Sequence, residues 1–293
     1  MEQLFWRSSR QFSGTRSVLR WWRNAAGRDL PPRGFVWIFH GIGEHGGRYA
    51  ELAEFLTQFG VDVIAPDWPG HGLSRSEGGQ RQLVSLDKIC REFWDAFEDW
   101  VEIGPLAKRG LAQSPWSIVS HSMGSAIALK LILDGKRPGR ELEFARRAFV
   151  SAPPLRLKLP VPAWKVALAK SLGKALPYLE LKNGIDPNTL THDAAVVAKY
   201  RKDTLVHEYA SPEIFLSIQD TVAQILARPQ EIEIPLCLAV GEEDQIVDPL
   251  AVRDYYGSLG THKKFLSYPG FRHEIFNEVD RKRVYEDLIG WLF

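Results

Sequence analysis

The sequence predicts a doubly wound, mostly parallel α/β sheet, and three observations support this prediction. Short apolar runs alternate along the chain with longer segments in which apolar residues recur at helical spacing. One of these runs, "GFVWIF" at residues 34–39, is apolar throughout, as expected for a strand that is buried on both faces of a parallel sheet. The chain has 293 residues, of which 45% are hydrophobic, which is enough for one large core. Ligands of such sheets bind at the carboxyl ends of the strands, so the loops there are the first place to look for a site.

The first 30 residues allow two interpretations. Six arginines and no acidic residue lie between Glu2 and Asp29, and a transit peptide has this composition. Aromatic and branched residues also cluster in two runs, residues 5–13 and 17–23, separated by a turn at Gly14. We prefer two opening β-strands, and a targeting segment remains the alternative.

Two strand–loop–helix units follow. Residues 34–39, "GFVWIF", predict a buried strand that leads into the loop "HGIGEHGG" and a helix over 49–59, which ends before Gly60. Residues 61–65, "VDVIA", predict the next strand. A helix is expected from Leu86 to Val101, with one apolar face formed by Phe93, Phe97 and Trp100.

Four further runs predict the remaining strands of the sheet, at residues 116–120, 147–152, 235–240 and 264–269. The interval from Pro153 to about Ile232 breaks the alternation, because it contains no β-like run and has helical segments such as 164–176 and 193–203. We therefore expect an α/β core made of residues 1–152 and 233–293. Residues 153–232 are expected to form a helical cap inserted over the carboxyl edge of the sheet.

Ser122 is the candidate nucleophile. It lies between the strand at 116–120 and a helix that closes at Asp134 and Gly135. A serine on a tight strand-to-helix turn needs small residues two positions before and two positions after it. Gly124 satisfies the second requirement. Ser120 occupies the first position, where glycine is usual, but it is also small.

A serine hydroxyl needs a base to accept its proton and a carboxylate to orient that base. Asp244 and His273 each lie in a loop just after a predicted strand, at the same edge of the sheet as Ser122. Asp248 is the strongest rival of Asp244, and Glu242 and Glu243 share its loop. His262 precedes its strand and would lie at the opposite edge, which favours His273 as the base.

Backbone N–H groups must also face the developing oxyanion. We expect one from Met123, which follows the nucleophile, and one from Ile42 in the "HGIG" loop. His40, His45 and His71 lie in the same loops. They lack a convergent set of carboxylates, so we expect no metal and no other cofactor.

Several motifs carry a resemblance to a known family. They are "HGIGEHGGRY", "APDWPGHGLS", "SHSMGS", "GEEDQIVD" and "YPGFRHEIFNE", together with "YRKDTLVHEYASPEIF" in the predicted cap. In this order they resemble the serine hydrolases grouped with monoacylglycerol lipases and lysophospholipases, within the α/β-hydrolase superfamily. The resemblance covers the chain from about Phe35 to its end. Ser120 and Ser125 depart from it, since glycine is common at both positions.

The resemblance implies an α/β-hydrolase fold with Ser122 as nucleophile, Asp244 as acid and His273 as base. It also implies an oxyanion hole formed by Ile42 and Met123. We expect two-step acyl transfer on the carboxylic ester of a single-chain lipid, with a monoacylglycerol as the leading substrate. A lysophospholipid or a short-chain ester is the alternative. A binding protein without turnover is a possibility of another class, which the presence of all three triad residues disfavours.

Composition limits the partners. Lys and Arg number 37 and Asp and Glu 36, so we expect no nucleic-acid partner. Two cysteines favour a reducing compartment, and we expect a cytoplasmic protein. The apolar, lysine-bearing segment 157–176 of the cap can make transient contact with a membrane surface or pack on the core. Its lysines are Lys158, Lys165, Lys170 and Lys174. The sequence predicts no particular oligomeric state.

Overall fold

A seven-stranded sheet forms the centre of the molecule. The computed structural model describes residues 18–24, 33–75, 81, 83–97, 104, 107–109, 114–135, 145–158, 166–167, 169–171, 176–260 and 262–293. The strands of the sheet are β1 (Val18–Trp22), β2 (Phe35–Phe39), β3 (Asp62–Asp67), β4 (Trp116–His121), β5 (Arg147–Ser151), β8 (Leu236–Gly241) and β9 (Lys263–Tyr268).

The strands are ordered β1-β3-β2-β4-β5-β8-β9 across the sheet. All neighbouring pairs are parallel except β1 and β3. Every residue of β2, β3 and β8 is buried, as the apolar sequences of β2 and β8 predict, and β3 also buries Asp62 and Asp67 at its two ends. The predicted fold class, a mostly parallel α/β sheet, is confirmed.

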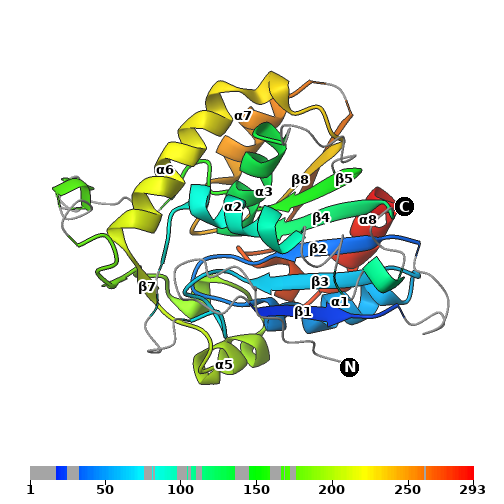
Figure 1. The fold of residues 1–293 in the computed structure, drawn as a ribbon, viewed down its shortest axis with the longest axis horizontal. Helices are drawn as coiled ribbons and strands as arrows, with labels where there is room; N and C mark the ends of the chain where they lie inside the picture. The colour runs from blue at the N-terminus through cyan, green and yellow to red at the C-terminus, as the bar shows by residue number, and fades with distance from the viewer. Residues whose placement is uncertain are drawn as a thin grey trace.

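Helices cover both faces of the sheet. The helices α1 (Ala50–Thr57) and α8 (Arg281–Leu292) pack on one face, where their apolar side chains meet those of Val36, Ile38 and Phe149. On the other face lie α2 (Leu86–Phe97), α3 (Met123–Leu133), α6 (Pro212–Ala227) and α7 (Pro249–Ser258). Figure 1 shows α2, α3 and α6 together on this side of the sheet. Short 3-10 helices occur at Gly46–Tyr49, Ala107–Arg109, Pro187–Thr189, Pro229–Glu231 and Ile275–Asn277.

Outside the interval 153–232, the predicted elements match the structure where it describes them. The second N-terminal run contains β1, which pairs with β3 at the edge of the sheet. The first run, residues 5–13, lies outside the described residues, as does the rest of the Arg-rich segment 2–29 apart from residues 18–24, so the targeting alternative stays a prediction. The helix predicted from Leu86 is α2, described as far as Phe97. Trp100 lies outside the described residues.

The interval predicted as a helical cap, residues 153–232, contains helix α5 (Ala194–Lys202) within the predicted segment 193–203. In the segment 164–176, residues 166–167 and 169–171 are helical. The expectation that this interval contains no strand was wrong. Two-residue strands β6 (Leu181–Lys182) and β7 (Tyr209–Ala210) pair antiparallel there, and runs this short leave no periodic pattern in a sequence.

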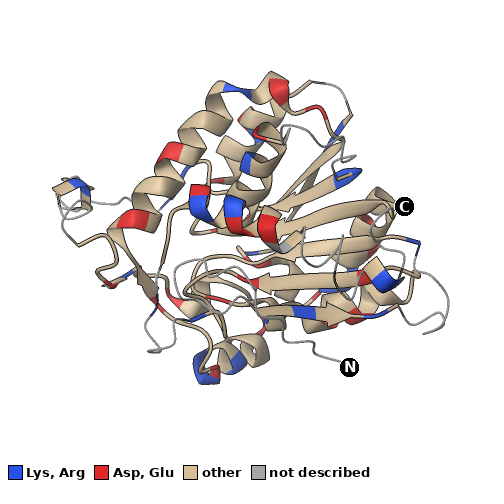
Figure 2. Ribbon diagram, viewed as in Figure 1, with Lys and Arg blue, Asp and Glu red and all other residues tan. Residues whose placement is uncertain are grey.

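Charges of both signs are interspersed over the helices, whereas the ribbon of the central strands carries few of them (Figure 2). Within the described part of the chain, none of the helices combines the length and the apolar character that crossing a bilayer requires.

Candidate active site

Ser122 occupies a strained turn between β4 and α3. Its backbone has φ 52° and ψ −120°, a combination that residues with a side chain rarely adopt. The turn depends on Gly124, because a Cβ atom at this position would lie 2.2 Å from the Phe39 carbonyl oxygen. The serine therefore sits where the sheet's central strand ends and the helix begins, at the edge that the sequence predicts.

The two serines that depart from the family motif interact with each other. Ser120 Oγ lies 3.1 Å from Ser125 Oγ, and the Ser125 hydroxyl donates to the Ser151 carbonyl oxygen at 2.7 Å. Both side chains are fully buried. Each hydroxyl thus has a partner in the interior, and the pair ties the turn to strand β5.

Asp244 and His273 are joined directly. His273 Nδ1 lies 2.7 Å from Asp244 Oδ2, and both side chains are buried. Asp244 Oδ1 accepts the N–H groups of Ile246 and Val247 at 2.8 and 2.9 Å. The carboxylate is therefore held from one side by its own loop and points its other oxygen at the imidazole.

Their charges stabilise each other. Burial alone would raise the pKa of Asp244, but the His273 charge and the three hydrogen bonds lower that pKa below its ordinary value. Burial alone would lower the pKa of His273, but the Asp244 charge and hydrogen bond outweigh burial and raise it. The pair favours an ionised carboxylate and makes the imidazole more basic than usual.

Asp248, the alternative candidate for the acid that orients His273, has other partners. Its carboxylate caps α7 by accepting the Leu250 N–H at 3.0 Å, and it pairs with Arg156 at 2.8 Å. The Glu242 carboxylate accepts from the Ser267 hydroxyl at 2.7 Å, on the surface. Within the described residues, Asp244 is the acidic side chain that contacts the His273 ring nitrogen.

The Gly41–Ile42 loop lies directly against Ser122. A Cβ atom at Gly41 would be 3.2 Å from the Ser122 Cβ. The Gly41 N–H donates to Glu44 Oε1 at 2.6 Å. Among the described residues, no acceptor is found for the N–H groups of Ile42 or Met123. Both lie next to Ser122, one in the loop after β2 and one at the start of α3, so both can donate to an oxyanion there.

The loop histidines that could suggest a metal have other partners. His40 Nδ1 bonds the Gly41 carbonyl oxygen and its Nε2 accepts the Trp68 N–H. His45 Nε2 lies 2.9 Å from Asp203 Oδ2, a residue of the predicted cap. His71 Nδ1 bonds the Pro69 carbonyl oxygen. In the described parts of the chain, no group of three or more His, Cys, Asp or Glu side chains converges as a metal site would require.

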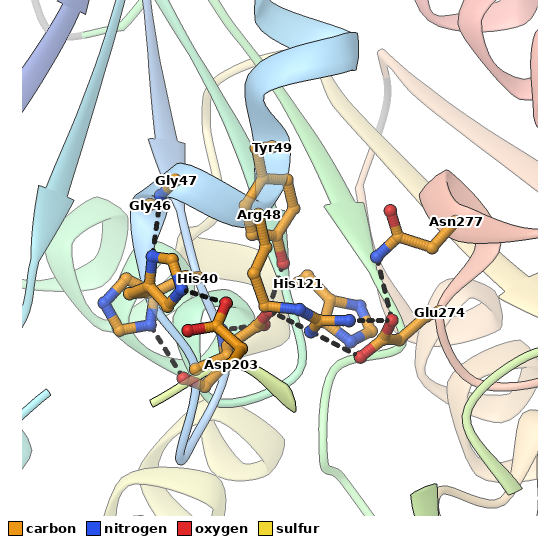
Figure 3. Close-up of polar contacts among 12 residues, drawn as sticks. His40, Gly46, Gly47, Arg48, Tyr49, His121, Asp203, Glu274 and Asn277 are labelled. Atoms are coloured by element: carbon orange, nitrogen blue, oxygen red, sulfur yellow. Dashed lines mark hydrogen bonds and ion pairs between the residues drawn. The ribbon is translucent and has the colours of Figure 1, made fainter. Parts of the chain in front are cut away.

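Sequence reasoning missed a buried ion-pair cluster beside the site. Arg48 lies between two carboxylates, bonding Glu44 Oε2 at 2.6 Å and both oxygens of Glu274 at 2.7 Å (Figure 3). The spacing of Glu44 and Arg48 by four residues is a readable signal for an ion pair. Glu274 is 226 residues from Arg48, and no pattern in one sequence connects them.

A cavity brings these groups together. Ser122, His273 and His121 line it with the Gly41–Ile42 loop, the ion-pair residues Glu44, Arg48 and Glu274, and three residues of the predicted cap, Ile185, Leu190 and Tyr200. The structure therefore gathers the predicted nucleophile, base and loop at one opening. Ser122 and His273 face the same cavity, although no hydrogen bond between them is formed. Such bonds are often long before a substrate binds.

Residues 30–280 match the model of the serine aminopeptidase S33 family of hydrolases. The chain belongs to this family. A monoacylglycerol lipase of Mycolicibacterium smegmatis is 31% identical over 271 residues, covering 90% of this chain and 89% of that one. Human monoglyceride lipase is 30% identical over 267 residues, covering 89% and 82%.

A solved structure is also similar. The crystal structure of the monoacylglycerol lipase of Paleococcus ferrophilus matches with a TM-score of 0.80 and 28% identity, covering 95% of this chain and 98% of that one. The resemblance to monoacylglycerol lipases within the α/β-hydrolases, stated from the motifs, is thereby confirmed.

Proposed function

We propose that this S33-family hydrolase is a monoacylglycerol lipase in which Ser122 is the nucleophile, His273 the general base and Asp244 the residue that orients it. The observation that carries the proposal is that His273, which is hydrogen-bonded to Asp244, lines the same cavity as Ser122. Relatives named monoacylglycerol or monoglyceride lipase, similar over nearly the whole chain, support the choice of substrate.

The first step is acylation. Because His273 Nδ1–H donates to Asp244, the lone pair of the ring is on Nε2, which takes the proton from Ser122 Oγ as the oxygen attacks the ester carbonyl. The carbonyl oxygen becomes an oxyanion and accepts the N–H groups of Ile42 and Met123. As the carbon–oxygen bond to the alcohol breaks, the Nε2 proton passes to the leaving glycerol oxygen.

The second step is deacylation. Water gives a proton to His273 Nε2 and its oxygen attacks the acyl carbon. The tetrahedral intermediate uses the same two N–H groups. When it collapses, the bond to Ser122 Oγ breaks, Nε2 returns its proton to that oxygen, and a fatty acid leaves. In both steps His273 Nε2 accepts a proton and then gives it to the leaving oxygen.

An ester substrate fits the cavity better than the amino-terminal peptide that the family name suggests. An aminopeptidase needs a carboxylate that can pair with a protonated amine. The carboxylates in this cavity are those of Glu44 and Glu274, and all four of their oxygens already have donors: Arg48, Gly41, Tyr49 and Asn277. Binding an amine would require breaking this buried cluster.

The proposal includes contact with a lipid surface. Exposed apolar side chains gather in one segment of the predicted cap, namely Leu176, Tyr178, Leu179 and Leu181. Lys170 precedes them and is also exposed. An apolar strip with nearby cations suits the surface of an anionic bilayer or micelle. We further propose a cytoplasmic location, which the two buried free cysteines support.

The direct test is release of fatty acid from a series of monoacylglycerols, compared with lysophospholipids and short-chain p-nitrophenyl esters. We expect the highest kcat/KM on a monoacylglycerol, and no turnover by Ser122→Ala. Preference for a lysophospholipid or a short-chain ester would change the substrate assignment. A folded wild-type protein that is inactive on all three classes would favour a binding role instead.

A further inference from the structure

The Glu44–Arg48–Glu274 cluster links two parts of the proposed catalytic apparatus that are far apart in the sequence. Arg48 is held by two hydrogen bonds to the Glu274 carboxylate and one to Glu44. Its side chain is 7% exposed, and those of Glu44 and Glu274 are 4% exposed. Bidentate pairing fixes the plane of the guanidinium, so Glu44 is held in one orientation as well.

At one end the cluster holds the loop beside Ser122. Glu44 Oε1 accepts the Gly41 N–H at 2.6 Å and the Tyr49 hydroxyl at 2.8 Å. The next amide of the loop, the Ile42 N–H, has no acceptor among the described residues, and Ile42 lines the same cavity as Ser122. The Glu44 carboxylate thus holds the His40–Gly41 peptide, and His40 Nδ1 holds the next peptide through the Gly41 carbonyl oxygen at 2.8 Å, so the peptide that carries the Ile42 N–H is fixed from both sides of the Gly41 Cα.

At the other end the cluster holds the residue next to His273. Glu274 donates its backbone N–H to the Leu190 carbonyl oxygen at 2.8 Å, and its carboxylate accepts the Asn277 amide at 2.8 Å. The Tyr200 ring of α5 lies over the guanidinium, with 4.7 Å between the Arg48 Cζ and the ring centroid. Figure 3 shows Arg48, Glu274 and Asn277 pointing toward one another.

The carboxyl groups of the cluster act on His273, because the charges of Glu274 and Glu44 both favour the charged imidazole and raise its pKa. The charged or titratable groups that face the imidazole are Asp244, Glu274, Glu44, Arg48 and His121. Burial would raise the pKa of Glu274, but Arg48 holds it at about 2, so this carboxylate is ionised. Burial lowers the pKa of His121 to about 3, with His273 adding to the effect, so His121 is neutral.

We propose that Glu44, Arg48 and Glu274 are positioning residues for acyl transfer: the Arg48–Glu274 pair fixes Glu44, and Glu44 anchors Gly41 so that the following Ile42 N–H is held where it meets the oxyanion. This inference rests on the proposed function, because it assigns the residues to the same acyl-transfer site. The three residues act through Ile42 and His273 and form no bond to the reacting carbon.

The test compares Glu44→Ala with Glu44→Gln on a soluble p-nitrophenyl ester. Alanine removes the acceptor of the Gly41 N–H, whereas the glutamine amide oxygen retains it. Arg48 keeps its bidentate Glu274 partner in both variants. We expect kcat to fall about 10²-fold in Glu44→Ala, the cost of one displaced oxyanion donor, with KM changed less than about threefold. Glu44→Gln should recover at least about tenfold of that loss.

Arg281→Gln is the matched control. It breaks another ion pair between the core and the predicted cap, Arg281 with Asp193 at 3.1 Å, away from the cavity. This variant should keep kcat within about threefold of wild type. If Glu44→Ala behaves like this control, or if Glu44→Gln is as slow as Glu44→Ala, the positioning role is wrong. An inactive wild-type protein would instead refute the proposed function, so the two failures are distinguishable.

Glu274→Gln gives a second readout that does not require the alanine variant to fold. Removing a negative charge beside His273 should move the acid limb of kcat/KM to lower pH, and losing one bond to Arg48 should lower kcat about tenfold. An unchanged acid limb together with an unchanged kcat would overturn the proposal.

Discussion

Asp244 Oδ2 lies 2.7 Å from His273 Nδ1, and the other oxygen of the same carboxylate accepts two backbone N–H groups of its own loop. The Asp244 carboxylate is thus held by its own loop independently of its bond to the imidazole. The loop itself is tied to the histidine loop, since the Glu243 N–H donates to the Phe271 carbonyl oxygen at 2.9 Å. This arrangement fixes the ring orientation that a serine nucleophile requires.

Replacing Asp244 by Asn should lower kcat by roughly 10⁴-fold, because an amide in place of the carboxylate favours the wrong imidazole tautomer. Asp248→Asn is the matched control. Asn also caps helices well, and the exposed pair with Arg156 contributes at most about 1 kcal/mol, so activity should be retained. Steady-state kinetics on one activated ester measure both variants. Severe loss in Asp248→Asn alone would reverse the assignment of the acid.

The raised pKa of His273 predicts the pH profile. The base must be neutral to accept the Ser122 proton, so kcat/KM should rise with pH through the pKa of His273, at a midpoint above the ordinary imidazole value of 6.5. The profile is measured on a substrate that does not ionise in this range. A midpoint at or below 6.5 would show that the Asp244 charge does not act on this imidazole in the way the geometry implies.

The raised pKa of His273 also makes the free energy of unfolding depend on pH. A raised pKa in the folded state means that charged His273 is stabilised by folding. This contribution is fully present below the unfolded-state pKa and is lost as pH rises through the folded-state value. Urea unfolding of wild type and Asp244→Asn across this pH range should therefore differ most on the acid side of neutrality. A difference between the two proteins that does not depend on pH would contradict the linkage.

The Ser120–Ser125 contact predicts a structural role for the two unusual serines of the turn. Ser125→Ala removes the hydroxyl that bonds the Ser151 carbonyl oxygen and contacts Ser120 Oγ. We expect the free energy of unfolding to fall by about 0.5 to 1.5 kcal/mol, because one buried hydrogen bond is lost while the Ser151 carbonyl oxygen keeps the Ser122 N–H at 3.0 Å. The kcat value should stay within about threefold of wild type. Lost activity at unchanged stability, measured by urea unfolding and ester kinetics, would instead give Ser125 a part in the chemistry.

The exposed apolar strip of the predicted cap should govern access to lipid. Replacing Leu176 and Leu179 by Ser should reduce binding to anionic vesicles and turnover of emulsified long-chain monoacylglycerol, and leave turnover of a soluble short ester unchanged. Val279→Ser, at a 63% exposed apolar side chain far along the chain, is the control. Equal vesicle binding by all of these proteins in a flotation assay would place the lipid contact elsewhere.

The parts of the fold that sequence predicts best are those with a strong local signal. Strands such as Phe35–Phe39 and Leu236–Gly241 are short and free of charged residues, as expected for strands buried on both faces of the sheet. Their carboxyl ends meet at one edge, so the loops that follow can be assigned to one site without coordinates. The chain order of Ser122, Asp244 and His273 adds to that inference.

Other features depend on contacts that no local pattern encodes. The choice between Asp244 and Asp248 depends on which side chain faces His273 in a folded loop. The partnership of Arg48 with Glu274 joins residues 226 positions apart. The two-residue strands Leu181–Lys182 and Tyr209–Ala210 pair only because the interval between them folds back, and neither is long enough to show alternation.

The measurement that tests the central claim most directly is labelling with a fluorophosphonate, followed by peptide mapping, in wild type and Ser122→Ala. The reagent traps a serine activated by a neighbouring base. We predict stoichiometric loss of ester turnover with modification on Ser122 alone, slower labelling in Asp244→Asn, and no labelling in Ser122→Ala. Modification of another residue with the same loss of activity, or full activity after Ser122 is modified, would contradict the assignment of the nucleophile.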